Sequence, residues 1–231
     1  MKSNIDMKKF VRILVAIVFL GALAFTNNVK AQMSGTYTVG SGGTYPSLTT
    51  AYNALVTNGI NGPVVLSVIS DLSGQQTLSG SVSGASATNT ITITSSIGNP
   101  DSCTIGKNSN YALYIQNGVN NLLVKDITIG ESSNTSQQCG VCFNTSSTIY
   151  TNIEFRGCNI NSYNQATSSN YAAVYYSGSS SSSYYFNNLR FIENNINGGY
   201  YNIYLNYPSG SSSRMASRVG VTIDSNVLSD A

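Results

Sequence analysis

The sequence contains no histidine and no tryptophan, and charged residues make up only 9% of its 231 residues. Without histidine, the Ser-His-Asp and Cys-His mechanisms of nucleophilic catalysis and histidine-based metal sites are excluded. A disordered chain typically combines high charge with few aromatic side chains, whereas this chain has 16 Tyr and 7 Phe. The composition therefore predicts a folded protein whose polarity comes mainly from uncharged side chains.

Positive charge is scarce outside the N-terminus. The formal net charge is +2, but five basic residues and one acidic residue lie within the first 31 positions: Lys2, Lys8, Lys9, Arg12, Lys30 and Asp6. The rest of the chain has a net charge of −2. Such a surface lacks the basic patch with which proteins bind phosphate backbones, so nucleic acid is not expected as a partner.

The N-terminus has the pattern of a secretory signal peptide. Basic residues up to Arg12 precede an apolar stretch over residues 13–25, and Val29-Lys30-Ala31 supplies the small residues of a cleavage site. A bilayer-spanning helix needs about 20 apolar residues, more than this stretch provides. We therefore predict a signal peptide over residues 1–31, a secreted or cell-surface location, and no membrane span after cleavage.

A repeat with the period of a β-strand runs through the second half of the chain. Segments 120–129, 151–160, 187–196 and 219–228 superpose without gaps, at offsets of 31, 36 and 32 residues. Their apolar residues alternate with polar ones and fall into three columns: Leu122, Ile153, Leu189 and Val221; Val124, Phe155, Phe191 and Ile223; Ile129, Ile160, Ile196 and Leu228. Residues 91–94 begin an earlier repeat. This alternation is that of β-strands with one buried face.

A second set of strands lies between these segments and recurs with nearly the same period. Its apolar pairs are Leu113/Ile115, Val141/Phe143, Val174/Tyr176 and Ile203/Leu205. Two strand columns that share one period indicate a coil that stacks on itself. The sequence thus predicts an all-β fold, a right-handed parallel β-helix, with repeats over residues 91–231.

Residues 32–90 differ from the repeats and are expected to form an N-terminal cap and a first coil. Residues 36–39 and 64–69 are predicted strands, and residues 48–56 fit a short amphipathic helix between them. Ser47 can cap that helix and Asn58-Gly59 can end it. A solenoid exposes its core at each end, so we expect this helix to cover the first coil.

One polar column and four cysteines have structural interpretations. The column of Ile127, Cys158, Asn194 and Asn226 predicts either a ladder of inward amides at a bend or asparagines chosen for a left-handed turn.

The cysteines are Cys103, Cys139, Cys142 and Cys158. Cys139-x-x-Cys142 has the spacing of a metal or redox pair, but small buried residues of a β-solenoid are the favoured interpretation. Their disulfide state is left open, and neither a metal nor a cofactor is predicted.

The opening of the predicted mature chain resembles a known family. Residues 35–55 (GTYTVGSGGTYPSLTTAYNAL) and 58–66 (NGINGPVVL) are similar to the start of secreted pectin-lyase-like right-handed parallel β-helix proteins. The similarity is to large surface proteins of Gram-negative bacteria that use the type nine secretion system. The resemblance implies the fold and an extracellular location, but no activity. Because such relatives continue through more coils to a sorting domain, it also implies an N-terminal fragment with truncated repeats.

Catalytic residues are not predicted. Asp126 and Glu193 share a column two coils apart, which places them roughly 10 Å from each other, near the separation of about 6.5–9.5 Å in inverting glycosidases. Any two carboxylates two coils apart would give this distance. An outward polar row on a solvated face is therefore the favoured interpretation. The paired aspartates of polygalacturonases and the signatures of pectin esterases are not found.

Tyrosines are the candidate binding residues. Tyr114, Tyr175 and Tyr204 occupy one outward column, interrupted by Cys142, and further tyrosines follow on later coils: Tyr184, Tyr185, Tyr200, Tyr201 and Tyr207. Such rings suit a sugar or a partner surface. Cross-strand packing that only stabilises the sheet is the alternative.

These observations predict a non-catalytic, exported β-solenoid that serves as a surface or adhesion module and binds a polysaccharide or cell-surface glycan. The rival hypothesis is a polysaccharide lyase or glycoside hydrolase whose site lies in missing coils or in loops. A third is a truncated product without activity of its own. An open last coil would also predict self-association through its free edge.

Overall fold

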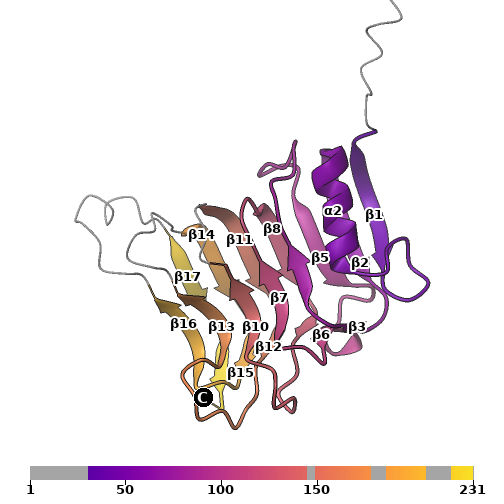
Figure 1. Ribbon diagram of the computed structural model, residues 1–231. Coiled ribbons are helices and arrows are strands. Elements are labelled where there is room, and N and C mark those ends of the chain that lie inside the picture. Colours follow the sequence, from indigo (N-terminus) through magenta and orange to yellow (C-terminus); the bar gives the residue numbers. More distant parts are fainter. Residues whose placement is uncertain (1–30, 145–148, 178–185, 207–219, 231) are drawn as a thin grey trace, which may run out of the picture. The chain divides into compact units, whose positions relative to one another are not determined.

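The computed structural model describes residues 31–144, 149–177, 186–206 and 220–230. Nearly all of the predicted signal peptide, residues 1–30, lies outside the described residues. From β2 onward the chain passes through three parallel sheets in a fixed order, A, B and C, and then repeats the circuit (Figure 1). The fold is the predicted all-β parallel β-helix.

Each coil contributes at most one strand to each sheet. Sheet A contains β1 (Met33–Val39), β2 (Ile60–Val68), β5 (Ile91–Ser95), β8 (Asn120–Lys125), β11 (Tyr150–Arg156), β14 (Phe186–Ile192) and β17 (Val221–Asp224). Sheet B contains β3 (Leu72–Ser73), β6 (Thr104–Lys107), β9 (Thr128–Ile129), β12 (Asn159–Asn161), β15 (Asn195–Asn197) and β18 (Val227–Ser229). Sheet C contains β4 (Gln76–Leu78), β7 (Tyr111–Ile115), β10 (Cys139–Phe143), β13 (Ala172–Ser177) and β16 (Tyr201–Asn206).

The strand register confirms the repeat columns. Ile153 of β11 pairs with Leu122 of β8 and with Leu189 of β14, and Ile160 pairs with Ile129 and Ile196. Side chains of these columns fill the interior, where Phe155 and Phe191 stack with ring centroids 5.1 Å apart. Burial of such stacked rows is the main stabilising contribution in a solenoid, because each coil contacts only its neighbours.

The one α-helix within the described residues, α2 (Leu48–Asn58), covers the first coil, as predicted. The Ser47 side chain accepts a hydrogen bond from the backbone N–H of Thr50, and Gly59 ends the helix at a φ of 71°. The helix lies beside β4: Thr49 Oγ1 accepts from the N–H of Thr77, and the Tyr52 hydroxyl donates to the Gly80 carbonyl. These two hydrogen bonds give partners to backbone groups in and near β4, the first strand of sheet C.

The bend from sheet A to sheet B contains the predicted ladder of inward amides. Asn194 Oδ1 accepts from the Cys158 N–H, and Asn226 Oδ1 accepts from the Asn194 N–H. Asn194 is 1% exposed. The alternative, that these asparagines supply the left-handed turn, is wrong: the positive φ belongs to the residue before each column member, Asp126, Gly157, Glu193 and Ser225.

The last coil exposes residues that are interior in earlier coils. Ile223 and Leu228 are 49% and 52% exposed, although Phe191 and Ile196 in the same columns are fully buried. Sheets A and B also end at β17 and β18, each paired on one side only. Within the described residues, this end of the solenoid is therefore uncovered. Among the described residues, no helix has the length and apolarity that crossing a membrane requires.

Candidate functional site

The candidate tyrosines lie on the outer face of sheet C. Tyr114 of β7 pairs in register with Cys142 of β10, which pairs with Tyr175 of β13, and Tyr175 pairs with Tyr204 of β16. Their neighbours along each strand, such as Leu113 and Val174, point into the core. The structure thus places the three tyrosines in one column with Cys142 between the first two.

Stacked rings connect the last two coils of this face. The Tyr175 and Tyr204 rings are stacked with centroids 5.3 Å apart and planes inclined by 15°. Tyr201 stacks on Tyr204 at 5.1 Å, and Tyr200 meets Tyr201 edge-on at 4.9 Å. Three of the other tyrosines named above, Tyr184, Tyr185 and Tyr207, lie outside the described residues. Tyr175, Tyr204, Tyr201 and Tyr200 therefore form a continuous aromatic row.

A second column, which the sequence reasoning missed, lies beside the first. Tyr111 pairs in register with Cys139, Cys139 with Ala172, and Ala172 with Tyr201. Tyr111 also stacks on Tyr114 at 5.8 Å. The available signal was the Tyr-x-x-Tyr spacing in β7, which does not follow strict alternation because Ala112 and Leu113 are both buried. We call Tyr111, Tyr114, Tyr175, Tyr201 and Tyr204 the tyrosine face.

Small, buried side chains occupy the middle of the tyrosine face. Cys139 and Cys142 are 1% and 6% exposed. Burial raises the pKa of the Cys139 thiol, and it also raises the pKa of the phenols of Tyr111 and Tyr114. These three groups are therefore neutral at physiological pH and present no reactive thiolate or phenolate.

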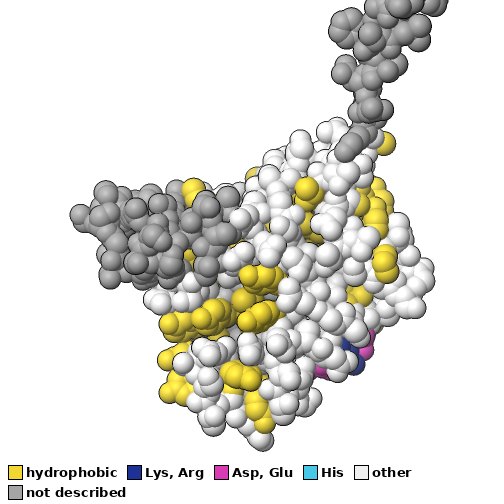
Figure 2. Space-filling view, viewed as in Figure 1, with side chains coloured by type: hydrophobic (Ala, Val, Ile, Leu, Met, Phe, Trp, Pro, Cys, Tyr) yellow, Lys and Arg dark blue, Asp and Glu magenta, His cyan; other side chains and the backbone are white. Residues whose placement is uncertain are grey.

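The tyrosine face is apolar and uncharged. Figure 2 shows hydrophobic side chains gathered over β7, β10, β13 and β16, whereas the charged side chains in that view lie to one side, near β3 and β6. A ligand that binds here would gain from ring contacts and phenol hydrogen bonds rather than from ion pairs. The face therefore favours neutral ligands.

The carboxylates of sheet A take part in surface ion pairs. Asp126 Oδ2 lies 3.2 Å from Lys125 Nζ, and Glu193 Oε2 lies 3.6 Å from Arg156 NH1. Both acidic residues occupy the left-handed turn position, and Gly157 separates them in the column. Each carboxylate thus has a basic neighbour on a solvated face, an arrangement common on protein surfaces.

The four cysteines are buried and form no disulfides. Cys139 and Cys142 interact through their side chains within the tyrosine face. Nowhere in the described parts of the chain do three or more Cys, Asp or Glu side chains gather as metal ligands would. The four cysteines are therefore buried structural residues of the solenoid, and two of them, Cys139 and Cys142, lie within the tyrosine face.

No family model, curated protein or solved structure matches this chain.

Proposed function

We propose that this chain is a non-catalytic, exported surface or adhesion module that binds a polysaccharide or cell-surface glycan through the tyrosine face. The observation that supports binding is the row of stacked rings on β13 and β16, where Tyr201 is 36% exposed, continued by Tyr200, which precedes β16 and is 47% exposed. A contiguous exposed patch of apolar side chains often marks a binding surface. Here the rings remain accessible along the solenoid axis.

A glycan is the ligand class that fits the chemistry of the face. One side of a sugar ring presents C–H groups that pack on an aromatic ring, and its hydroxyls can exchange hydrogen bonds with phenols. Tyrosine also loses little conformational entropy on binding, because it has only two side-chain torsions. Stacking between Tyr175 and Tyr204 further orders the rings in advance.

The tyrosine face offers ring contacts on three of the four coils from β7 to β16, because cysteines replace the tyrosines on β10. Neighbouring parallel strands lie about 4.8 Å apart, so a linear polymer laid along the solenoid axis would meet one coil after another. Weak contacts of each ring would then add up through multivalency. This geometry favours a polysaccharide over a single small sugar as the ligand of the tyrosine face.

A glycan array tests the proposal. The mature chain is compared with the double variant Tyr175→Ala/Tyr204→Ala and with Tyr37→Ala/Tyr45→Ala as a matched control. Tyr37 and Tyr45 form another ring pair, with centroids 6.0 Å apart, near the N-terminal cap. We expect the first double variant to bind at least tenfold more weakly and the control to bind like the wild type. Equal binding by all three proteins would contradict the proposal.

Export is a separate part of the proposal, supported by the basic and apolar N-terminal pattern. If the signal peptide is cleaved after Ala31, the mature protein begins at Gln32. Intact mass of the protein recovered outside the cytoplasm measures this directly. Recovery of the uncleaved chain from the cytoplasm alone would contradict export.

A further inference from the structure

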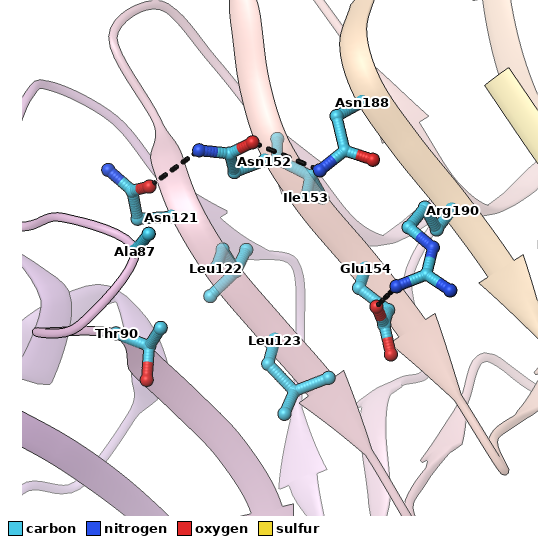
Figure 3. A pocket seen from close by; sticks show the side chains of 10 residues that line it. All are labelled: Ala87, Thr90, Asn121, Leu122, Leu123, Asn152, Ile153, Glu154, Asn188 and Arg190. Atoms are coloured by element: carbon cyan, nitrogen blue, oxygen red, sulfur yellow. Dashed lines mark hydrogen bonds and ion pairs between the residues drawn. The ribbon is translucent and has the colours of Figure 1, made fainter. Parts of the chain in front are cut away.

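A hollow of about 290 Å³ lies on the outer side of sheet A, away from the tyrosine face (Figure 3). Asn121, Asn152 and Asn188 form a row along one side of the hollow, and Leu123 lies between Thr90 and Glu154. These residues come from the starts of β8, β11 and β14 and from the segment before β5. The strands hold the lining in a fixed register.

The asparagine row is a ladder of side-chain amides. Asn188 Nδ2 donates to Asn152 Oδ1 at 3.0 Å, and Asn152 Nδ2 donates to Asn121 Oδ1 at 2.9 Å. All three residues have positive φ, which asparagine tolerates better than most residues, and Gly220 takes the same position in the next coil. Each amide has two N–H groups and two oxygen lone pairs. The ladder therefore leaves a donor and an acceptor at Asn152 for a ligand.

The opposite side of the hollow is charged but internally neutralised. Glu154 Oε1 accepts from Arg156 Nε at 2.7 Å, and its Oε2 lies 2.8 Å from Arg190 NH1. Glu193 Oε2 lies 3.6 Å from Arg156 NH1, so two carboxylates balance two guanidiniums. These bonds fix the Arg190 guanidinium, which has further N–H donors to offer. Leu123 adds an apolar surface. Fixed amide donors and acceptors, an apolar patch and a compensated ion pair together suit a neutral ligand rich in hydroxyls.

We propose that this hollow is a second binding site, one that takes a single neutral sugar ring. An amide that offers one donor and one acceptor matches a pair of adjacent hydroxyls, and Leu123 can contact the C–H face of the ring. A volume of about 290 Å³ is at the small end of ligand sites, which favours one ring over an extended chain. The inference rests on the proposed function for its ligand class, while its residues are separate from the tyrosine face.

Solution NMR with methyl glycosides of glucose, galactose and mannose as probes tests this site. We expect at least one probe, at millimolar concentration, to shift the side-chain amide signals of Asn121, Asn152 and Asn188 and the methyl signals of Leu123. The same shifts should persist in Tyr175→Ala/Tyr204→Ala. Absence of shifts with all three probes, or their loss in that tyrosine variant, would overturn the inference.

Two glycine variants provide the matched comparison. Asn152→Gly keeps the left-handed backbone and removes the central amide, whereas Asn108→Gly makes the same change at another residue with positive φ, outside the hollow. We expect the affinity for the probe to fall about tenfold in Asn152→Gly and to stay unchanged in Asn108→Gly. Unchanged affinity in a folded Asn152→Gly variant would contradict the site.

If Asn152→Gly does not fold, Asn188→Gly replaces it, because Gly220 shows that the column accepts glycine. The two proposals also fail separately. If the wild type binds nothing on the array but the probes shift the asparagine amide signals, only the proposal for the tyrosine face is overturned. If the wild type binds on the array but no probe shifts those signals, only the proposal for the hollow is overturned.

Discussion

Asparagine has two different roles at the two ends of the sheet A strands. Asn194 and Asn226 are inward and satisfy backbone groups of the neighbouring coil, as the polar column predicted. Asn121, Asn152 and Asn188 adopt left-handed turns and bond to each other on the outside. The superposed repeats contain this second column too, with Gly220 as its last member. Its mixture of Asn and Gly was the available signal of a positive φ.

Replacement of Asn194 should destabilise the fold strongly. Asn194→Ala would remove the acceptor that the buried Cys158 N–H uses and the amide that donates to the Phe155 carbonyl. We expect the free energy of unfolding to fall by about 1–3 kcal/mol. Asn159→Ala is the control, because Asn159 bonds to Asp101 and Thr128 on the exposed side and should contribute below about 1 kcal/mol. Urea unfolding measures both, and equal effects would contradict the assigned role.

Cys158 should make stability depend on alkaline pH. Burial raises the pKa of its thiol from 9.0 to about 12. Above pH 9 the thiol ionises in the unfolded chain but not in the folded one, so stability present below pH 9 is lost between pH 9 and 12. The expected loss is about 1.4 kcal/mol for each pH unit.

Urea unfolding of wild type and Cys158→Ala under reducing conditions, at a series of pH values, isolates this contribution from that of the other buried thiols and phenols. The wild type should lose stability more steeply than the variant above pH 9. Parallel pH profiles would show that the Cys158 thiol ionises equally in both states.

At the scale of elements, the sequence predicted the strands of sheet A most fully, because they alternate over four or more residues in most coils. Strands of sheet C were recognised from one apolar pair in each coil, and strands of sheet B only from the single column of Ile129, Ile160, Ile196 and Leu228. Several strands of sheet B span only two or three residues, such as Thr128–Ile129, too few for alternation to be detected. The stacking of Tyr111 on Tyr114 was missed because two consecutive buried residues, Ala112 and Leu113, break the alternation of β7.

The cap helix should contribute to stability through its buried side. Leu55 is fully buried against the first coil, whereas Asn53 on the same helix is exposed. Leu55→Ala should lower the free energy of unfolding by about 2–5 kcal/mol, and Asn53→Ala should be neutral or slightly stabilising, because alanine favours helix. Thermal unfolding of the two variants compares them, and a harmless Leu55→Ala would show that α2 does not seal the core.

At the scale of the molecule, the last described coil leaves apolar side chains uncovered, and we propose that this 231-residue chain self-associates through them. Val221, Ile223, Val227 and Leu228 are all more than one third exposed, at 39%, 49%, 63% and 52%. Together with the unpaired edges of β17 and β18, they present apolar side chains and free backbone groups to a second molecule.

Sedimentation velocity over a range of concentrations measures that association. We expect the mature chain to form larger species as its concentration rises, and Ile223→Lys/Leu228→Lys to remain monomeric. Thr222→Lys is the control, because Thr222 lies on the same strand between two inward residues and points outward. A wild-type chain that stays monomeric at every concentration would contradict this expectation.

We propose that the solenoid binds glycans without cleaving them. The most direct test incubates the mature chain with neutral and uronate-containing polysaccharides, with and without Ca²⁺, and measures new reducing ends, unsaturated products and binding in the same samples. We expect at least one polysaccharide to bind and all of them to remain uncleaved. Turnover that disappears in Asp126→Ala would contradict it and would assign the carboxylates of sheet A to catalysis.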